Sequence, residues 1–369
     1  MGRELAAAIG RWVTLENHPV HPTLVAVADV DSSALRWFDR VASVRTLTTD
    51  YRELLDDPTV DVVYVAVPHH LHEQVMCDVL AAGKDMLAEK PFGIDLAAAE
   101  RIAGSAESAD AFVRVSSEMP FFPGAQLAID YVRSGAVGQV IEAVSSLRHS
   151  SDLNRDKPIN WKRQTAYCGE IGVMGDLGMH VAHVPARLGW HPDRLYAVLQ
   201  DLVRERPDGG QGRVVCDTID NASLHTWVGG AHGGFPLTFE TWRIAPGESN
   251  TWRLRVLGMD GGVDFSTRNP KAVNVFSVDG GRQRWSTLEV GSQSVFPTAT
   301  GGIFEFGFSD AILQMWAAYL AERAGALGDR FGCATPDEAL CAHRLFAAAL
   351  ESHRDGQAHR LVPREREPA

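Results

Sequence analysis

The sequence predicts an α/β domain followed by an α+β domain: a doubly wound parallel sheet over residues 1–118, then an open, mostly antiparallel sheet with helices over 119–369. Short apolar strands alternate with amphipathic helices in the first third of the chain, which is the pattern of a parallel sheet. Later strands follow one another across glycine and aspartate turns, as in antiparallel hairpins. The 369 residues, 45% of them hydrophobic, suffice for two cores.

The elements of the first domain follow from this alternation. The runs "TLVAVADVD" at 23–31 and "VDVVYVAVP" at 60–68 are apolar, as buried parallel strands are. A helix is expected after each, and Gly83 is placed to close the second helix. The strand at 85–91, the helix at 95–107 and the strand at 111–117 complete the predicted domain.

The start of this domain lacks an expected feature. A dinucleotide-binding Rossmann sheet opens with a strand and a G-x-G-x-x-G loop, yet this sequence begins "MGREL", with Gly2 where the last glycine would stand. We therefore expect the first strand and the glycine-rich loop to be missing. We also expect that Met1 is not the true start of the protein and lies inside a longer chain.

The second domain is predicted from its turns and its closing helices. A helix is expected at 123–135, followed by the strands "QVIEAVSSLRHS", "ASLHTWVGG", "PLTFETWRI" and "WRLRVLGMDGGVDFST". Two helices close the chain, at 309–326 and from Thr335 onward, where Thr335 is an N-cap, Pro336 the first helical residue and Glu338 the capping-box partner. The tail "PREREPA" is expected to be frayed.

Composition excludes several classes of function. The net charge of −12, from 35 basic and 47 acidic residues, gives no electrostatic basis for binding nucleic acid or an anionic membrane. The five cysteines are scattered without a CxxC pair, so neither a disulfide framework nor a zinc cluster is expected, and a cytoplasmic location suits them. No apolar run approaches membrane-spanning length.

Charged and polar residues stand where predicted parallel strands end. Ligands of open parallel sheets bind beyond the carboxyl ends of the strands, and Asp29, the stretch 68–72 and the stretch 89–91 lie there. A carboxylate at Asp29 suits the ribose diol of an adenine dinucleotide, with a helix N-cap as the equally weighted alternative. Asp29 favours NAD over NADP because it repels a 2′-phosphate, although the hydroxyls of Ser32 and Ser33 could accept one.

The stretch "AEKPFG" at 88–93 places a lysine at a strand end. Proline after Lys90 favours extended geometry at that lysine, so its ammonium is expected to face the ligand crevice and to bond a substrate hydroxyl. A solvated surface ion pair is the alternative.

The stretch "GEIGVMGDLGMHVAHV" at 169–184 supplies a second group. Asp176 and His180 are four residues apart and share a helix face; imidazole is the usual base for an alcohol proton, and a nearby carboxylate orients the ring. A structural Asp–His hydrogen bond is the alternative. The pair His180 and His183 has no third ligand at a metal-site spacing, so no metal is predicted. The histidines at 69, 70 and 72 are more simply explained as capping or surface groups.

These motifs together resemble the oxidoreductases grouped as glucose-fructose oxidoreductase, inositol dehydrogenase and MocA-type proteins, over nearly the whole chain. The residues that carry the resemblance are "AEKPFG", "VAVPHHLH", "GDLGMH", "RLRVLGMDGGVDF" and the C-terminal helix. The resemblance implies a nicotinamide-dependent dehydrogenase of a sugar, cyclitol or related polyol, with a Rossmann domain and an open-sheet domain. It also implies a homodimer or homotetramer.

The resemblance also implies a role for each matching position. The catalytic residues are Lys90, Asp176 and His180, with His180 as the base. The cofactor is expected to contact Gly2, Asp29, Pro68, His69, His72, Glu89 and Lys90, and the substrate Trp161, Lys162 and His183. His183 stands where many relatives have an acidic residue. Lys162 and Arg163 could instead be simply solvated. Two further activities stay open by resemblance, a glycosidase that oxidises its sugar transiently and a ligand-sensing regulator.

Overall fold

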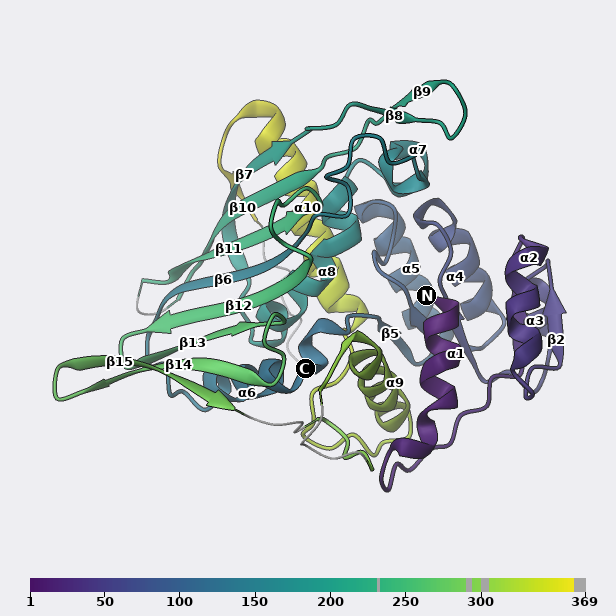
Figure 1. The fold of residues 1–369 in the computed structure, drawn as a ribbon, viewed down its shortest axis with the longest axis horizontal. Helices are drawn as coiled ribbons and strands as arrows, with labels where there is room; N and C mark the ends of the chain where they lie inside the picture. Colours follow the sequence, from purple (N-terminus) through teal and green to yellow (C-terminus); the bar gives the residue numbers. More distant parts are fainter. Residues whose placement is uncertain (231–232, 290–293, 300–304, 362–369) are drawn as a thin grey trace.

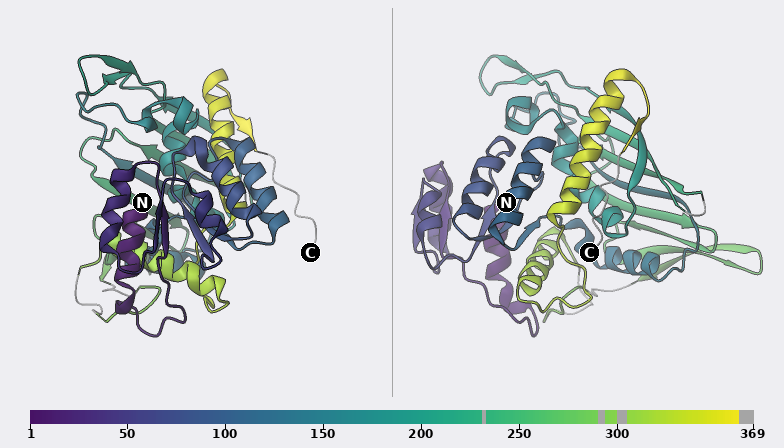
Figure 2. Two further views of the ribbon diagram at one scale, coloured as in Figure 1. Left: turned by 90° about the vertical axis from the view of Figure 1, so that its right-hand side faces the viewer. Right: turned by 180° about the vertical axis from the view of Figure 1, so that it is seen from behind.

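The computed structural model describes residues 1–230, 233–289, 294–299 and 305–361. Figure 1 shows a large sheet that fans out on one side and the helices α1 to α5 on the other, with α8 and α10 between them. The views in Figure 2 show α10 running across one face of that sheet. None of the helices in the described ranges is long and apolar enough to cross a membrane.

The first part of the chain forms parallel strands, as predicted, but in two sheets. One pairs β1 (Ala26–Ala28) with β2 (Thr46–Thr48), and the other has the order β3-β4-β5, namely Val62–Val65, Asp85–Ala88 and Val113–Val115. The single doubly wound sheet that we predicted is therefore interrupted. The physical reason is that, in the described ranges, no strand hydrogen-bonds to both β1 and β3.

The helices around these strands are α1 (Gly2–Gly10), α2 (Ser32–Leu35), α3 (Arg52–Asp56), α4 (His72–Ala81) and α5 (Leu96–Ala109). The helix predicted after β1 is short, since α2 continues only as a 3₁₀ turn, η2 (Arg36–Arg40). Gly83 follows α4 with a φ of 69°, a left-handed conformation that glycine adopts without strain. The predicted helix end is thus confirmed.

A nine-stranded sheet forms the second part of the fold, in the order β15-β14-β13-β12-β6-β11-β10-β7-β16. Every neighbouring pair is antiparallel except β6 with β11. The strands are β6 (Val140–His149), β7 (Pro192–Gln200), β10 (Asn221–Val228), β11 (Phe235–Trp242), β12 (Asn250–Gly258), β13 (Gly261–Ser266), β14 (Ala272–Asp279), β15 (Arg282–Glu289) and β16 (His359–Arg360). The mostly antiparallel prediction is confirmed.

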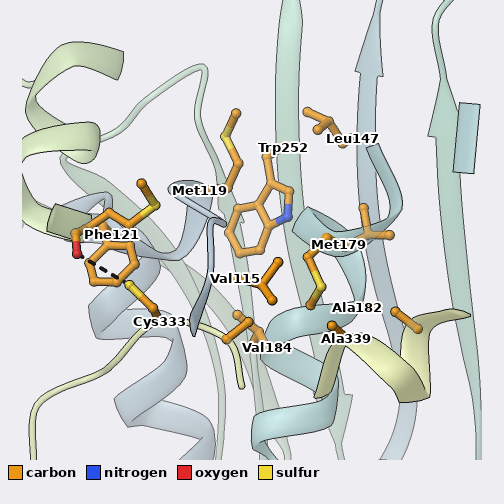
Figure 3. Close-up of a cluster of buried hydrophobic side chains, with 14 of the residues drawn as sticks. Val115, Met119, Phe121, Leu147, Met179, Ala182, Val184, Trp252, Cys333 and Ala339 are labelled. Atoms are coloured by element: carbon orange, nitrogen blue, oxygen red, sulfur yellow. Dashed lines mark hydrogen bonds between the residues drawn. The ribbon is translucent and has the colours of Figure 1, made fainter. Parts of the chain in front are cut away.

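One face of this sheet is covered by α6 (Pro123–Arg133), α8 (Gly172–Arg187) and α10 (Pro336–Asp355). Inward residues of the strands alternate with outward ones, as a half-buried sheet requires. Trp252 of β12 is fully buried at the centre of this core, beside Met179 and Val184 of α8 (Figure 3). Its indole Nε1 donates a hydrogen bond to the carbonyl oxygen of His180 at 2.9 Å, which ties the core to a predicted site residue.

The closing helices match their predicted starts. The helix α9 (Phe308–Arg323) packs against α1, so the last third of the chain contacts its beginning. At α10, Thr335 Oγ1 accepts from the Glu338 amide at 3.2 Å and the Thr335 amide donates to Glu338 Oε2 at 2.8 Å. The capping box is thereby confirmed. The tail "PREREPA" lies outside the described residues.

A small hairpin projects beyond the large sheet. It consists of β8 (Glu205–Pro207) and β9 (Arg213–Val215), close to the short helix α7 (Thr165–Cys168) in Figure 1. Its position matters below because its Arg206 holds the loop that leads to Trp161.

Candidate active site

The helix α8 places Asp176 and His180 on one buried face, as the four-residue spacing predicts. The glycines of this helix serve packing. A Cβ at Gly178 would lie 2.1 Å from the ring of Phe346 of α10, and a Cβ at Gly175 would lie 3.5 Å from Pro91. The glycine at 178 therefore lets α8 approach α10 closely, while the distance at Gly175 is an ordinary contact.

Lys90 and Asp176 form the centre of the site. Lys90 follows β4, and its Nζ donates to the backbone oxygen of Asp176 at 2.5 Å and to Oδ1 at 3.1 Å. The Lys90 side chain is 16% exposed and that of Asp176 9%, so the solvated surface pair considered above is excluded. The peptide bond between Lys90 and Pro91 is cis.

Lys162 is a second cation on the same carboxylate. It lies in the 3₁₀ turn η5 (Trp161–Arg163), and its Nζ is 2.7 Å from Asp176 Oδ1. Burial by itself raises the pKa of Asp176, but Lys90, Lys162 and Arg243 outweigh it and hold that pKa well below its usual range. Asp176 is therefore a carboxylate, and neither Lys162 nor the fully buried Arg163 is simply solvated.

Lys90 keeps its proton in this setting. Burial alone would lower the pKa of Lys90, yet the carboxylates of Asp176, Glu89 and Glu118 raise it above its ordinary value. The ammonium is consequently a hydrogen-bond donor to whatever oxygen reaches it.

His180 is buried and neutral. Burial, with help from the charge of Lys90, lowers the pKa of His180 to about 3, so at neutral pH its ring has a free lone pair to accept a proton. The predicted orientation of this ring by Asp176 is wrong, because Asp176 is bonded to the two lysines. The carboxylate nearest its Nδ1 is instead Glu118, with Oε2 at 3.7 Å.

Glu118 is a residue that our sequence analysis missed. It follows β5 at the same edge of the sheet as Glu89 and Lys90 follow β4, so the rule of strand ends could have found it. Burial raises the pKa of Glu118, and Lys90 opposes that shift. Glu89 in turn accepts a hydrogen bond from the Tyr64 hydroxyl and one from the Lys90 amide at 3.2 Å.

The histidines after β3 are mostly buried, contrary to their interpretation as capping or surface groups. His72 has its Nδ1 2.7 Å from the Pro91 carbonyl and its Nε2 2.9 Å from that of Val67. It holds the Lys90 loop and has no free ring nitrogen for the cofactor crevice, which corrects its predicted role. His69 stacks edge-on against Trp161 with ring centroids 4.7 Å apart; only His70 is exposed.

The predicted substrate residues separate into two places. Trp161 and Lys162 lie at the Lys90–Asp176 centre, as expected. His183 is fully buried elsewhere, with Nε2 3.4 Å from Arg187 Nη2 and 3.9 Å from Glu338 Oε2. Its prediction as a substrate residue is not supported, because His183 stands two turns, about 10 Å, further along α8 than Asp176, where its ring contacts Glu338 of α10 and Phe331.

The predicted cofactor residues lie at strand and helix ends. Asp29 follows β1, is exposed, and accepts from the Asp31 amide at 2.9 Å. The N-cap of α2 is Asp31, whose side chain accepts a hydrogen bond from the Ser33 amide at 2.8 Å. The N-cap role considered for Asp29 therefore belongs to Asp31. Gly2 is the first residue of α1, and Pro68 precedes the 3₁₀ turn η3 (His69–Leu71).

Two further groups surround Asp176 without having been predicted. Arg243 follows β11 and is 1% exposed, and His149 ends β6. Burial lowers the pKa of His149 to about 4, with opposing effects from Asp176 and Arg243. Among the described residues no group of three or more histidines, cysteines or carboxylates is placed to hold a metal ion.

Residues 6–117 match the model of an oxidoreductase family with an NAD-binding Rossmann fold. Levoglucosan dehydrogenase of Pseudarthrobacter phenanthrenivorans is 24% identical over 260 residues, which are 67% of this chain and 66% of that protein. D-xylose 1-dehydrogenase (NADP(+)) of Hypocrea jecorina is 33% identical over 146 residues, 38% of this chain and 37% of that protein. The chain thus aligns with 66% of the length of the first of these curated relatives and with 37% of the second.

The fold also matches solved structures over nearly its whole length. Levoglucosan dehydrogenase in complex with NADH superposes with a TM-score of 0.87 at 20% identity and covers 98% of this chain and 96% of its own. This confirms the predicted pairing of Rossmann-type parallel strands with a large, mostly antiparallel sheet.

Proposed function

We propose that this chain, which belongs to the Gfo/Idh/MocA family of NAD-binding oxidoreductases, transfers a hydride between a nicotinamide cofactor and a hydroxyl-bearing carbon of a sugar, cyclitol or related polyol. The observation that carries the proposal is the buried cluster in which Lys90 is protonated beside Asp176 while His180 stays neutral. A donor for the substrate oxygen and an acceptor for its proton are what such a reaction needs.

The residues present fit a dinucleotide. A free carboxylate edge at Asp29 suits a ribose diol, and the N-terminus of the nine-residue α1 suits a pyrophosphate. Pro68 and Glu89 stand at the ends of β3 and β4, at the same carboxyl edge. Asp31 adds a second carboxylate next to Asp29, with Ser33 Oγ donating to it at 2.8 Å, so NAD is favoured over a cofactor with a 2′-phosphate.

The protein side of the reaction follows from the protonation states. Lys90 donates a hydrogen bond to the substrate hydroxyl, which places that oxygen and stabilises the charge that develops on it. The neutral ring of His180 takes the hydroxyl proton, while Asp176 keeps Lys90 charged. A bound oxidised nicotinamide would supply the hydride acceptor, so that the alcohol would lose a hydride from carbon and a proton from oxygen and become a carbonyl.

The test is reduction of NAD or NADP by a panel of sugars and polyols, followed by absorbance of the reduced cofactor, with wild type, Lys90→Met and His180→Asn. We expect wild type to reduce a cofactor with at least one polyol and each variant to lose about 10²-fold or more in kcat. Titration with NADH should show binding by all three proteins. Unchanged kcat in both variants would overturn the assignment.

Two other outcomes identify the alternatives. Release of a leaving group from a glycoside without net cofactor reduction would indicate the glycosidase. Cofactor binding with no turnover of any panel member would indicate a ligand-sensing protein.

A further inference from the structure

We propose that the substrate carries a carboxylate, and that Arg243 and Lys162 bind it; the substrate class is then a sugar acid and not a neutral sugar. This inference rests on the proposed dehydrogenase function and narrows it. It starts from a buried guanidinium whose hydrogen-bonding groups are left without protein partners.

Arg243 is 1% exposed, and its Nη1 donates a hydrogen bond to the Lys162 carbonyl oxygen at 2.8 Å. Its Nε and Nη2 are buried and have no hydrogen-bond partner, and within the described residues no carboxylate oxygen lies within 4.0 Å of it. Buried donor groups that make no hydrogen bond are costly to a folded protein. An anionic ligand would remove that cost.

The other fully buried arginines of this region, Arg163 and Arg206, are each left with a single unpartnered nitrogen, Nε. Arg163 pairs with Asp220 and Asp152, and Arg206 donates to three backbone carbonyls, at 2.5, 2.7 and 3.3 Å. In the described part of the chain, Arg243 alone among the arginines has two buried guanidinium nitrogens without a partner. The pair of unpartnered nitrogens is therefore specific to Arg243 among the described arginines.

The two unpaired nitrogens also specify the shape of the ligand. Nε–H and Nη2–H point from the same edge of the planar guanidinium, and this edge binds both oxygens of a carboxylate through parallel hydrogen bonds. Because these nitrogens are shielded from bulk water, such a pair would be stronger than one on the surface.

The carboxylates nearest to Arg243 are already bonded to other cations. Asp176 Oδ1 is shared by Lys90 and Lys162, so one carboxylate faces two ammonium groups. Asp152, the other acid near Arg243, is bonded to Lys157 at 2.8 Å. Lys162 is 38% exposed and is the part of this cluster that a ligand meets from solvent; its Nζ lies 5.6 Å from the centroid of the Trp161 ring.

The experiment compares neutral and acidic partners that differ at one carbon, D-glucose with D-glucuronate and D-galactose with D-galacturonate, with D-glucose 6-phosphate as a second anion. In every pair that is turned over we expect the acid to have the higher kcat/KM, by about tenfold or more. A higher kcat/KM for the neutral partner, or for the phosphate, would overturn the inference. Absence of cofactor reduction with all compounds would instead count against the dehydrogenase function itself.

Variants locate the effect. Lys162→Met and Arg243→Gln should each lower the acid-to-neutral ratio of kcat/KM by about tenfold. Arg155→Gln is the matched control, since it removes one positive charge from the same loop at an exposed residue, and its ratio should equal that of wild type. If Arg243→Gln does not fold, the Lys162→Met variant alone tests the proposal. An acid-to-neutral ratio of kcat/KM in Lys162→Met equal to that of wild type would contradict it.

Discussion

At the scale of single residues, the site is set by opposite effects of burial on two neighbouring groups. His180 loses its proton because burial is not offset by a bonded carboxylate, and its pKa falls to about 3. Lys90 keeps its proton because three carboxylates offset the same burial. The protein thus holds an acid and a base side by side at neutral pH, which is the usual way enzymes divide these roles.

Asp29 allows a test of cofactor choice at this scale. Its replacement in Asp29→Ser removes the charge that bonds the ribose diol and repels a 2′-phosphate, so NADH should bind about tenfold more weakly while NADPH binds no worse. Fluorescence titration with both cofactors measures this. Asp39→Ser is the control because it removes an exposed carboxylate from the nearby 3₁₀ turn η2. Equal losses for both cofactors would contradict the role of Asp29.

At the scale of elements, the turn η5 is held in place by buried arginines. Arg163 inside the turn pairs with Asp220, which also accepts from the amides of Leu202 at 2.7 Å and Val203 at 2.9 Å. Arg206 of β8 clamps the preceding loop through its carbonyls. Lys162 therefore reaches Asp176 from a backbone that is fixed on both sides.

Breaking this buried pair should cost stability. In Asp220→Asn the fully buried Arg163 loses its main counter-charge, so the free energy of unfolding should fall by about 3–5 kcal/mol. Urea unfolding followed by circular dichroism measures it. Asp217→Asn is the control, because Asp217 is exposed and bonds only Thr165, at 2.7 Å, and should change stability by about 1 kcal/mol or less. Similar losses in the two variants would refute a special role for the buried pair.

At the scale of the whole molecule, buried histidines couple the fold to pH. Burial is the main cause that lowers the pKa of a set of them to values between about 2 and about 4: His69, His149, His180, His183 and His343. In the unfolded chain a histidine titrates near 6.5. At a pH between the folded pKa values and about 6.5, the unfolded chain binds more protons than the folded one. The free energy of unfolding therefore falls as pH drops below about 6.5 and is regained as pH rises.

His183 tests this coupling away from the active site. In His183→Gln the group that titrates is gone, so the slope of unfolding free energy against pH, between about 6 and 4, should flatten by up to roughly 1.4 kcal/mol per pH unit. Thermal and urea unfolding at several pH values measure the slope. His70→Gln, at an exposed histidine, should leave it as in wild type. A slope in His183→Gln equal to that of wild type would sink this account.

Oligomeric state also belongs to this scale. The resemblance predicts a homodimer or homotetramer, and sedimentation velocity over a range of protein concentrations would test it. A single species with the mass of one 40.2 kDa chain at every concentration would contradict the prediction.

Much of the fold follows from local signals in the sequence. The strands near 23–31 and 60–68, the end of α4 at Gly83 and the capping box at Thr335 rest on periodicity, glycine conformation and short-range hydrogen bonds. These depend on neighbours along the chain, and such contacts can be read from spacing alone. The same holds for the shared face of Asp176 and His180.

The tertiary structure decided which charges meet. Lys162 lies 14 residues and Lys90 86 residues from Asp176 in sequence, yet both bond one oxygen of its carboxylate. Arg243, Glu118 and His149 join them from strand ends that no local spacing relates, while His183, close in sequence to His180, faces another helix. Side-chain protonation depends on burial and on distant charges, so the sequence determined the candidate residues and the packing determined their roles.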